Sequence, residues 1–175
     1  MAQRIYLIST GGTIEKVYSE TTGTVRNESF KLDRYLQQLR LPDLEIDAVR
    51  LMNKDSLEMT AADRDLLLAA VRAKLESYAA PVVVTHGTDT MVESGMYLQQ
   101  NLGSDLSVPV IFTGAMTPLG FERSDGLQNL TESLIAAQIL PRGIWLVMHG
   151  MVFPIDRVRK DRERAVFVRT SPGLE

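Results

Sequence analysis

The stretch Ile5-Tyr6-Leu7-Ile8-Ser9-Thr10-Gly11-Gly12-Thr13 is an apolar run that ends at a glycine turn. Its length and composition are typical of a β-strand buried on both faces of a parallel sheet. Two adjacent glycines allow the backbone a positive φ or a close approach to another group. Thr13 is then displayed at the end of the strand, where a hydroxyl is held in place and accessible. A turn that only connects the strand to the next loop is the alternative interpretation.

The composition of the chain argues against several classes of function. The chain has 175 residues, of which 45% are hydrophobic, and this size favours a single domain, residues 1–175. A formal net charge of -3 argues against nucleic acid as a partner. No cysteine is present, which excludes disulfides and thiolate catalysis, and two histidines disfavour a histidine-rich metal site. No apolar run approaches bilayer length, so we expect a cytoplasmic protein without a membrane partner.

Strand and helix patterns alternate along the chain. Strand character recurs at residues 44–51, 81–85, 108–113 and 143–148. Helical periodicity or a helix start signal lies between these runs, at residues 30–39, 60–75, 92–102 and 124–139. The strands are too apolar for a sheet that is open to water on one side. The expected fold class is therefore α/β, a doubly wound, mostly parallel sheet with helices on both faces.

Two segments lie outside this alternation. Residues 14–29 are polar, contain Tyr18 and show neither a helical nor a strand period, so we expect a loop that acts as a lid over Thr13. In residues 151–175, the apolar residues Phe153, Ile155, Val166 and Val168 predict a short β-hairpin tail around the charged run 156–164.

Polar residues follow each predicted strand. In a doubly wound sheet, ligands bind beyond the carboxyl ends of the strands, and here these ends carry Ser, Thr, Asp, Gly or His. The five ends are expected to converge on one rim. A purely structural set of turns has no need to gather hydroxyls and carboxylates at the same edge, so the rim is the predicted site.

Five motifs in order resemble those of the bacterial-type L-asparaginases. They are Thr10-Gly-Gly-Thr-Ile14, Asp55-Ser-Leu-Glu-Met59, Thr85-His-Gly-Thr-Asp-Thr-Met91, Gly114-Ala-Met-Thr-Pro118, and Ser124-Asp-Gly126 with Asn129. The resemblance covers the amino-terminal domain of that family and then stops, so the chain looks like an unusually short form. It implies a hydrolase that converts L-asparagine to L-aspartate and ammonia through an acyl intermediate on threonine, with minor activity toward glutamine.

The resemblance also implies roles for individual residues. Thr13 matches the primary nucleophile, and Tyr18 is the phenol that polarises it from the lid. Thr88 and Asp89 match a second catalytic threonine and the acid that binds the substrate's ammonium, while Lys160 matches the active-site lysine. Ser56 holds the α-carboxylate, and the remaining substrate-binding positions are Asp55, Gly12, Gly87 and Ala115. The family's chemistry needs no metal or organic cofactor.

Each of these residues also has a structural interpretation. Thr88 and Asp89 are typical helix N-caps, and Asp55 is suited to the same role. Tyr18 in a loop is commonly a surface aromatic, and the charged run around Lys160 is typical of a solvated face. His86 is expected to support its turn through hydrogen bonds, and Asp125 to cap its helix or brace the neighbouring turn.

Amide hydrolysis needs a nucleophile, a proton acceptor, donors for the oxyanion and a proton for the departing ammonia. Tyr18 and Lys160 are the candidate bases, and helix starts after Thr13 and Thr88 are the candidate oxyanion donors. Two other functions stay open: the deamidating component of an amidotransferase, and a non-catalytic domain that binds an amino acid. Because the second family domain is missing, we also expect a homo-oligomer that covers the apolar surface left exposed.

Overall fold

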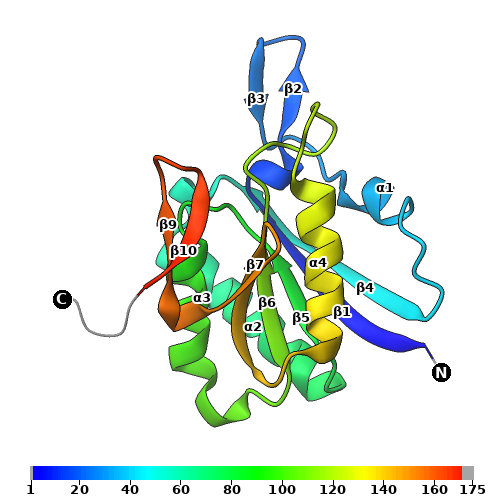
Figure 1. The fold of residues 1–175 in the computed structure, drawn as a ribbon, viewed down its shortest axis with the longest axis vertical. Coiled ribbons are helices and arrows are strands. Elements are labelled where there is room, and N and C mark those ends of the chain that lie inside the picture. The colour runs from blue at the N-terminus through cyan, green and yellow to red at the C-terminus, as the bar shows by residue number, and fades with distance from the viewer. Residues whose placement is uncertain (1, 171–175) are drawn as a thin grey trace.

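The central feature is a six-stranded sheet that runs through the molecule (Figure 1). A computed structural model describes residues 2–170. The strands lie in the order β4 (Leu44–Lys54), β1 (Gln3–Gly11), β5 (Val82–Thr85), β6 (Pro109–Thr113), β7 (Gly143–Met148) and β8 (Met151–Pro154). The first five are parallel to one another, and only β8 is antiparallel. The expected mostly parallel α/β fold is confirmed.

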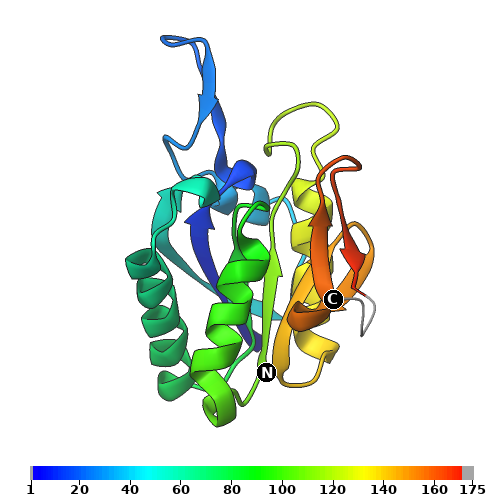
Figure 2. The same ribbon diagram turned by 90° about the vertical axis from the view of Figure 1, so that its left-hand side faces the viewer.

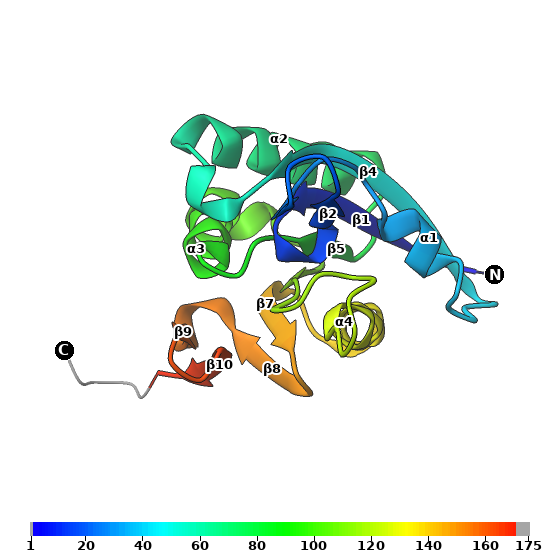
Figure 3. The same ribbon diagram turned by 90° about the horizontal axis from the view of Figure 1, so that it is seen from above.

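The strands are apolar on both faces because helices cover both faces. Every residue of β5 and β6 is buried. On one face, Ile8 and Val84 pack in a core with α2 (Ala61–Ser77) and α3 (Met91–Leu102). On the other face, Leu7 and Val83 pack with α4 (Gly126–Ile139) and the short α1 (Leu32–Leu36). Figure 3 shows the two helical layers from above. The double-sided burial explains the continuous hydrophobic runs in the sequence.

The helix expected from residue 60 begins as its sequence indicates. Thr60 is the N-cap of α2, and its hydroxyl accepts a hydrogen bond from the Asp63 amide. The Asp63 carboxylate in turn accepts from the Thr60 amide, which completes a capping box. None of the helices within residues 2–170 combines the length and the hydropathy needed to cross a membrane.

Residues 14–29 differ from the expected loop. The segment begins with a single 3-10 turn, η1 (Thr13–Glu15), and continues as an antiparallel hairpin of β2 (Val17–Ser19) and β3 (Thr24–Arg26). Figure 2 shows this hairpin, called the flap below, projecting beyond the end of the sheet. Because most flap side chains are solvated, the sequence has no apolar alternation that would reveal the two strands.

The tail also differs from the prediction. Phe153 lies in β8 of the main sheet and Ile155 lies in a 3-10 turn, so neither belongs to a tail hairpin. His149 and Gly150 have φ values of 55° and 74°, which suits the two-residue turn that brings β8 back beside β7. The hairpin is instead formed by β9 (Val158–Asp161) and β10 (Val166–Arg169). Residues 171–175 of the predicted tail lie outside the described part of the chain.

Candidate active site

The carboxyl ends of the three strands β1, β5 and β4 approach one another closely. Gly12, with φ of 75°, packs so tightly on the next turn that a Cβ there would overlap the backbone of Gly87. A Cβ at Gly87 would in turn overlap the side chain of Ser56. Glycine at both positions therefore permits the contact that brings the three strand ends together. Thr13 and Thr88, which follow the two glycines, are placed at the same part of the rim.

A hydrogen-bonded cluster lies at the end of β5. Lys160 of β9 donates from Nζ to Thr88 Oγ1 at 2.7 Å and to Asp89 Oδ1 at 3.1 Å. Thr88 is buried, and the side chain of Lys160 is 17% exposed. The structure thus unites three of the predicted catalytic residues across 72 residues of sequence. Thr90 occupies the N-cap position of the helix that follows, without a capping hydrogen bond from its side chain, so Thr88 and Asp89 are not the N-caps.

Asp89 forms an ion pair with a second cation. Arg162, in the turn of the β9–β10 hairpin, places Nη1 2.9 Å from Asp89 Oδ1, the same oxygen that Lys160 contacts. Arg162 is 66% exposed, whereas Asp89 is 26% exposed. The charged run of the tail is therefore not simply a solvated face, because two of its cations meet on one carboxylate at the rim.

A second ion pair lies at the end of β4. Lys16 Nζ is 2.6 Å from Asp55 Oδ2, and Asp55 Oδ1 accepts from the Leu57 amide at the start of a 3-10 turn. Burial works to raise the pKa of Asp55, but the Lys16 hydrogen bond, the Leu57 amide and the charge of Lys160 lower it below its ordinary value. Asp55 therefore both caps a turn and belongs to the charged rim.

Ser56 is held at the junction of two strand ends. It is 2% exposed, and its carbonyl accepts a hydrogen bond from Thr90 Oγ1 at 2.9 Å. The next side chain, Leu57, is 66% exposed. The serine predicted to bind substrate is thus packed beneath Gly87, while an apolar side chain stands in solvent beside it.

The flap half of the site is more open. Thr13 begins η1 and is partly buried, and Tyr18 on β2 is 58% exposed. Within residues 2–170, no hydrogen bond joins the Tyr18 hydroxyl to Thr13 or Lys160. Because η1 has only three residues, the helix start expected after Thr13 is a single 3-10 turn, which has little helix dipole. The Gly12 amide donates to the Lys54 carbonyl, so it does not serve as an oxyanion donor.

A buried carboxylate anchors the root of the flap. Glu15 is fully buried and accepts hydrogen bonds from Ser9 Oγ and from the Lys31 amide. Burial raises the pKa of Glu15 and lowers the pKa of Lys31, although each charge opposes the shift of the other. The Lys31 ammonium donates to the carbonyls of Lys16 and Leu119. Both ends of the flap are therefore tied to each other and to the loop after β6.

That loop is braced from α4. The Asp125 carboxylate accepts from the amides of Met116 and Thr117 and pairs with His149 Nε2 at 2.7 Å. Burial works to raise the pKa of Asp125. The hydrogen bonds from these two amides and from His149 outweigh burial, so the pKa lies below its ordinary value. Ala115, a predicted substrate contact, is fully buried behind this brace. Asp125 thus braces the turn, as expected.

His86 supports the turn after β5, as the sequence indicates. It is fully buried, with Nδ1 2.8 Å from the Gly87 carbonyl and Nε2 2.9 Å from Ser94 Oγ. The carbonyl can only accept, so Nδ1 carries the hydrogen and Nε2 accepts from the serine. Burial, assisted by the charge of Arg64, lowers the pKa of His86 to about 4. His86 is therefore a neutral structural group near pH 7.

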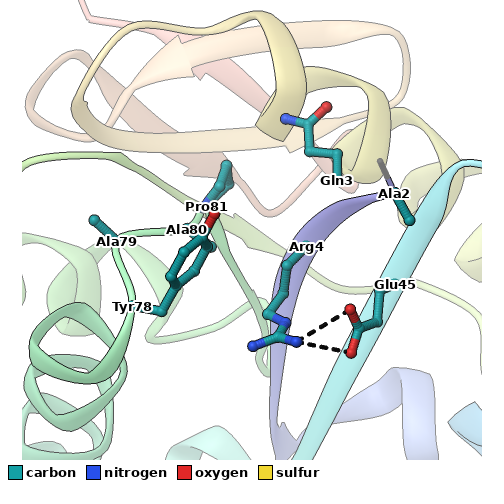
Figure 4. A pocket seen from close by; sticks show the side chains of 8 residues that line it. All are labelled: Ala2, Gln3, Arg4, Glu45, Tyr78, Ala79, Ala80 and Pro81. Atoms are coloured by element: carbon teal, nitrogen blue, oxygen red, sulfur yellow. Dashed lines mark hydrogen bonds and ion pairs between the residues drawn. The ribbon is translucent and has the colours of Figure 1, made fainter.

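One of two surface cavities adjoins the rim, and the other lies at the opposite ends of the strands. A cavity of about 380 Å³ lies between the flap and the end of β4, lined in part by Lys16, Asn27 and Asp55. A cavity of about 410 Å³ lies at the amino-terminal ends of the strands, where Arg4 pairs with Glu45 beside Tyr78 (Figure 4). Only the first adjoins predicted site residues. The second is at the wrong end of a parallel sheet for a ligand site.

Two residues near the rim, Arg162 and Asn27, were not recognised from the sequence. Arg162 is one of six Lys and Arg residues between positions 157 and 169, and no local pattern distinguishes it. Asn27 donates to the Gly12 carbonyl at 2.8 Å and to Asn53 Oδ1 at 2.9 Å, which joins the flap to two strand ends. These contacts link distant segments, so neither spacing nor periodicity reveals them.

The chain is similar in sequence and fold to known proteins. Residues 4–172 match the family model described as asparaginase, N-terminal. The glutamyl-tRNA(Gln) amidotransferase subunit from Aeropyrum pernix is 33% identical over 85% of this chain and 35% of its own length. L-asparaginase 1 of Escherichia coli is 30% identical over 97% of this chain. The thermostable L-asparaginase structure from Thermococcus kodakarensis is 27% identical over 95% of this chain, with a TM-score of 0.81.

These relatives are longer than the chain. It spans 51% of the E. coli protein and 51% of the T. kodakarensis chain, and still less of the amidotransferase subunit. The similarity therefore concerns one domain of proteins that have further parts.

Proposed function

The chain belongs to the asparaginase family, and on that premise we propose that it hydrolyses the side-chain amide of L-asparagine, giving L-aspartate and ammonia. The observation that carries the proposal is the Thr88–Asp89–Lys160 cluster, in which Lys160 Nζ lies 2.7 Å from Thr88 Oγ1. A lysine fixed on a hydroxyl beside the Gly12–Gly87 contact is an arrangement suited to proton transfer near a nucleophile.

In the first step of the proposed reaction, Thr13 Oγ attacks the carboxamide carbon. Its proton passes to a base, for which the candidates are Tyr18 and the neutral amine that Lys160 becomes after its ammonium gives up a proton. The C–N bond then breaks as ammonia leaves with the proton that the base returns. In the second step, water attacks the resulting ester and releases aspartate while Thr13 regains its proton. Backbone N–H groups that follow the two glycines are proposed to stabilise the oxyanion in both steps.

Substrate binding is proposed to involve the neighbouring strand ends. Ser56 is assigned to the α-carboxylate, and Asp89 to the α-ammonium. Gly12 and Gly87 allow the approach of the ligand and of each other. Asp55 contributes one negative charge to the rim, paired with Lys16, and Ala115 supports the wall formed by the loop after β6.

Ammonia release from L-asparagine and L-glutamine by the purified chain tests the proposal. We expect asparagine to be the better substrate, and Thr13→Ala to reduce turnover to the background level. Binding of L-aspartate, measured by calorimetry on the same two proteins, is the companion measurement. Bound aspartate without any turnover by the intact chain would contradict the hydrolase function and favour a binding domain.

A second candidate function is favoured by the similarity to the amidotransferase subunit, at 33% identity. In this case the chain would release ammonia for use by a partner protein. The two functions differ in the dependence of turnover on a partner. Asparagine hydrolysis by the purified chain at rates of about 1 to 10³ per second, as is typical of free enzymes, would oppose the partner-dependent function.

Association of the chain with itself also stays a prediction. Ile135 and Ile139 of α4 are 53% and 75% exposed, and Met151 of β8 is 45% exposed. We propose that a second copy covers this apolar surface, a general tendency of exposed hydrophobic patches. Light scattering over a range of concentrations tests it, and a monomer at every concentration would refute it. A cytoplasmic location is likewise a prediction, which cell fractionation tests.

A further inference from the structure

One carboxylate at the rim faces two cations. Asp89 Oδ1 lies 3.1 Å from Lys160 Nζ and 2.9 Å from Arg162 Nη1. Another acid of the rim, Asp55, has its own partner in Lys16 at 2.6 Å. Two cations therefore face one carboxylate at this point of the rim, although Asp89 is the acid assigned to a substrate ammonium.

Lys160 and Arg162 differ in how firmly they are held. Lys160 is 17% exposed and has a second contact with Thr88, so it is a fixed part of the cluster. Arg162 is 66% exposed and approaches Asp89 from a hairpin turn. An exposed ion pair of this kind contributes little to stability. Its main effect here is to place a removable positive charge where the α-nitrogen of a substrate is expected.

From this arrangement we propose that Arg162 is a specificity-determining residue, which makes the site favour β-carboxamide substrates whose α-nitrogen is uncharged, such as acylated asparagine. The inference rests on the proposed amidohydrolase function. A free α-ammonium must either displace Arg162 from Asp89 or lie beside two cations, and both cost binding energy. An acylated nitrogen carries no charge and does not incur this cost, while the α-carboxylate is still attracted.

The apolar surface nearby fits the same class of substrate. Leu57 is 66% exposed and follows Ser56, whose carbonyl accepts from Thr90, the residue after Asp89. We propose that an acyl group on the α-nitrogen packs on this apolar side chain, which comes from the same pair of strand ends as Asp89. A free ammonium gains nothing from this contact.

The test compares L-asparagine with N-acetyl-L-asparagine as substrates, using ammonia release. Arg162→Ala is expected to shift kcat/KM about fivefold toward free asparagine, mainly through a lower KM, because one cation beside the α-nitrogen is removed. Arg162→Lys keeps the cation and is expected to keep the wild-type preference. Arg164→Ala is the matched control, since Arg164 is an exposed cation of the same turn that bonds Asp161 through its backbone amide.

An unchanged preference in Arg162→Ala, or an equal shift in Arg164→Ala, would overturn the inference. If the wild-type chain hydrolyses neither amide, the proposed function fails and the inference is tested by binding alone. Calorimetry with L-aspartate and N-acetyl-L-aspartate then replaces turnover. The same fivefold change in relative affinity on Arg162→Ala supports the role of Arg162, whereas an unchanged ratio, or binding of neither acid, contradicts it.

Discussion

Lys160 exposes 17% of its side chain and contacts two residues of the rim, whereas Tyr18, on the flap, exposes 58%. Lys160 also comes from a two-stranded hairpin, β9–β10, but its ammonium is held by Thr88 and Asp89 at the end of β5 in the main sheet, called the sheet half below. Tyr18 projects from a two-stranded hairpin whose firm attachments lie at its root, through Glu15 and Lys31. The two halves of one candidate site are therefore held in different ways.

Because of this difference, we expect the two halves to contribute to catalysis in different ways. Buried and mutually hydrogen-bonded groups are preorganised, because their positions do not depend on the ligand. A tyrosine on an exposed hairpin reaches a substrate only if the substrate or the hairpin supplies the missing contacts. We therefore expect substitutions in the sheet half to affect both chemistry and stability, and substitution of the exposed Tyr18 side chain to affect chemistry alone.

Removal of the lysine is the largest expected effect. Lys160→Met is expected to lower kcat by about 10²- to 10⁴-fold, the usual contribution of a positioned proton-transfer group. Steady-state ammonia release measures it. Arg159→Met is the control, because Arg159 is an exposed neighbour in the same strand. Equal losses in both variants would show that the strand, and not the Lys160–Thr88 contact, is responsible.

The flap substitution tests the other half. Tyr18→Phe is expected to lower kcat by about 10²-fold, because the proposed proton carrier is lost. The free energy of unfolding should change by less than about 0.5 kcal/mol, as for other exposed positions. Activity and urea unfolding are measured on the same preparation. Full activity in Tyr18→Phe would remove the flap from the chemistry and leave Lys160 as the base.

Two glycine substitutions compare how tightly the strand ends and the flap turn are packed. Gly87→Ala is expected to cost about 1–3 kcal/mol of stability and most of the activity, because its Cβ would overlap Ser56. Gly23→Ala, at the flap turn, has open space around its Cβ and φ of 65°. It should cost about 1 kcal/mol from backbone strain and leave turnover intact. The prediction is wrong if the two variants lose activity equally.

The last prediction concerns the dependence of stability on pH, away from the reacting groups. The pKa of His86 is lowered to about 4 in the folded protein, below its ordinary value of 6.5, so acid favours the unfolded state. Stability supplied by neutral His86 is present above pH 6.5 and is lost as the pH falls toward 4. The lowered pKa of Asp125 acts in the same direction. Unfolding free energies of wild type and His86→Gln, measured between these pH values, should show a shallower slope in the variant. Equal slopes would contradict the assignment.

Much of the sheet half could be predicted from the sequence. The runs that became β1, β5 and β6 are apolar because they are buried on both faces, and the Thr60–Asp63 cap is a local signal. Because parallel strands run in the same direction, their carboxyl ends must lie on one rim. For this reason the positions of Thr13, Ser56 and Thr88 at the rim could be inferred, although their catalytic or binding roles are still proposals.

The flap and the tail could not be predicted in the same way. The pairing of β2 with β3 depends on backbone hydrogen bonds between mostly solvated residues, which leave no hydrophobic period. The turn at His149 and Gly150 reverses the chain into β8 by positive φ values, for which the sequence offers one glycine as a hint. The meeting of Arg162 with Asp89 spans distant segments, so only the three-dimensional arrangement reveals it.

The central claim is that Thr13 forms a covalent ester with substrate at the rim built by Gly12 and Gly87. The most direct test is acid quenching of the chain during turnover of L-asparagine, followed by proteolysis and mass spectrometry. We predict an aspartyl adduct on the peptide that contains Thr13, absent from Thr13→Ala. An adduct on Thr88 or Ser56 instead, or undiminished ammonia release by Thr13→Ala, would contradict the account.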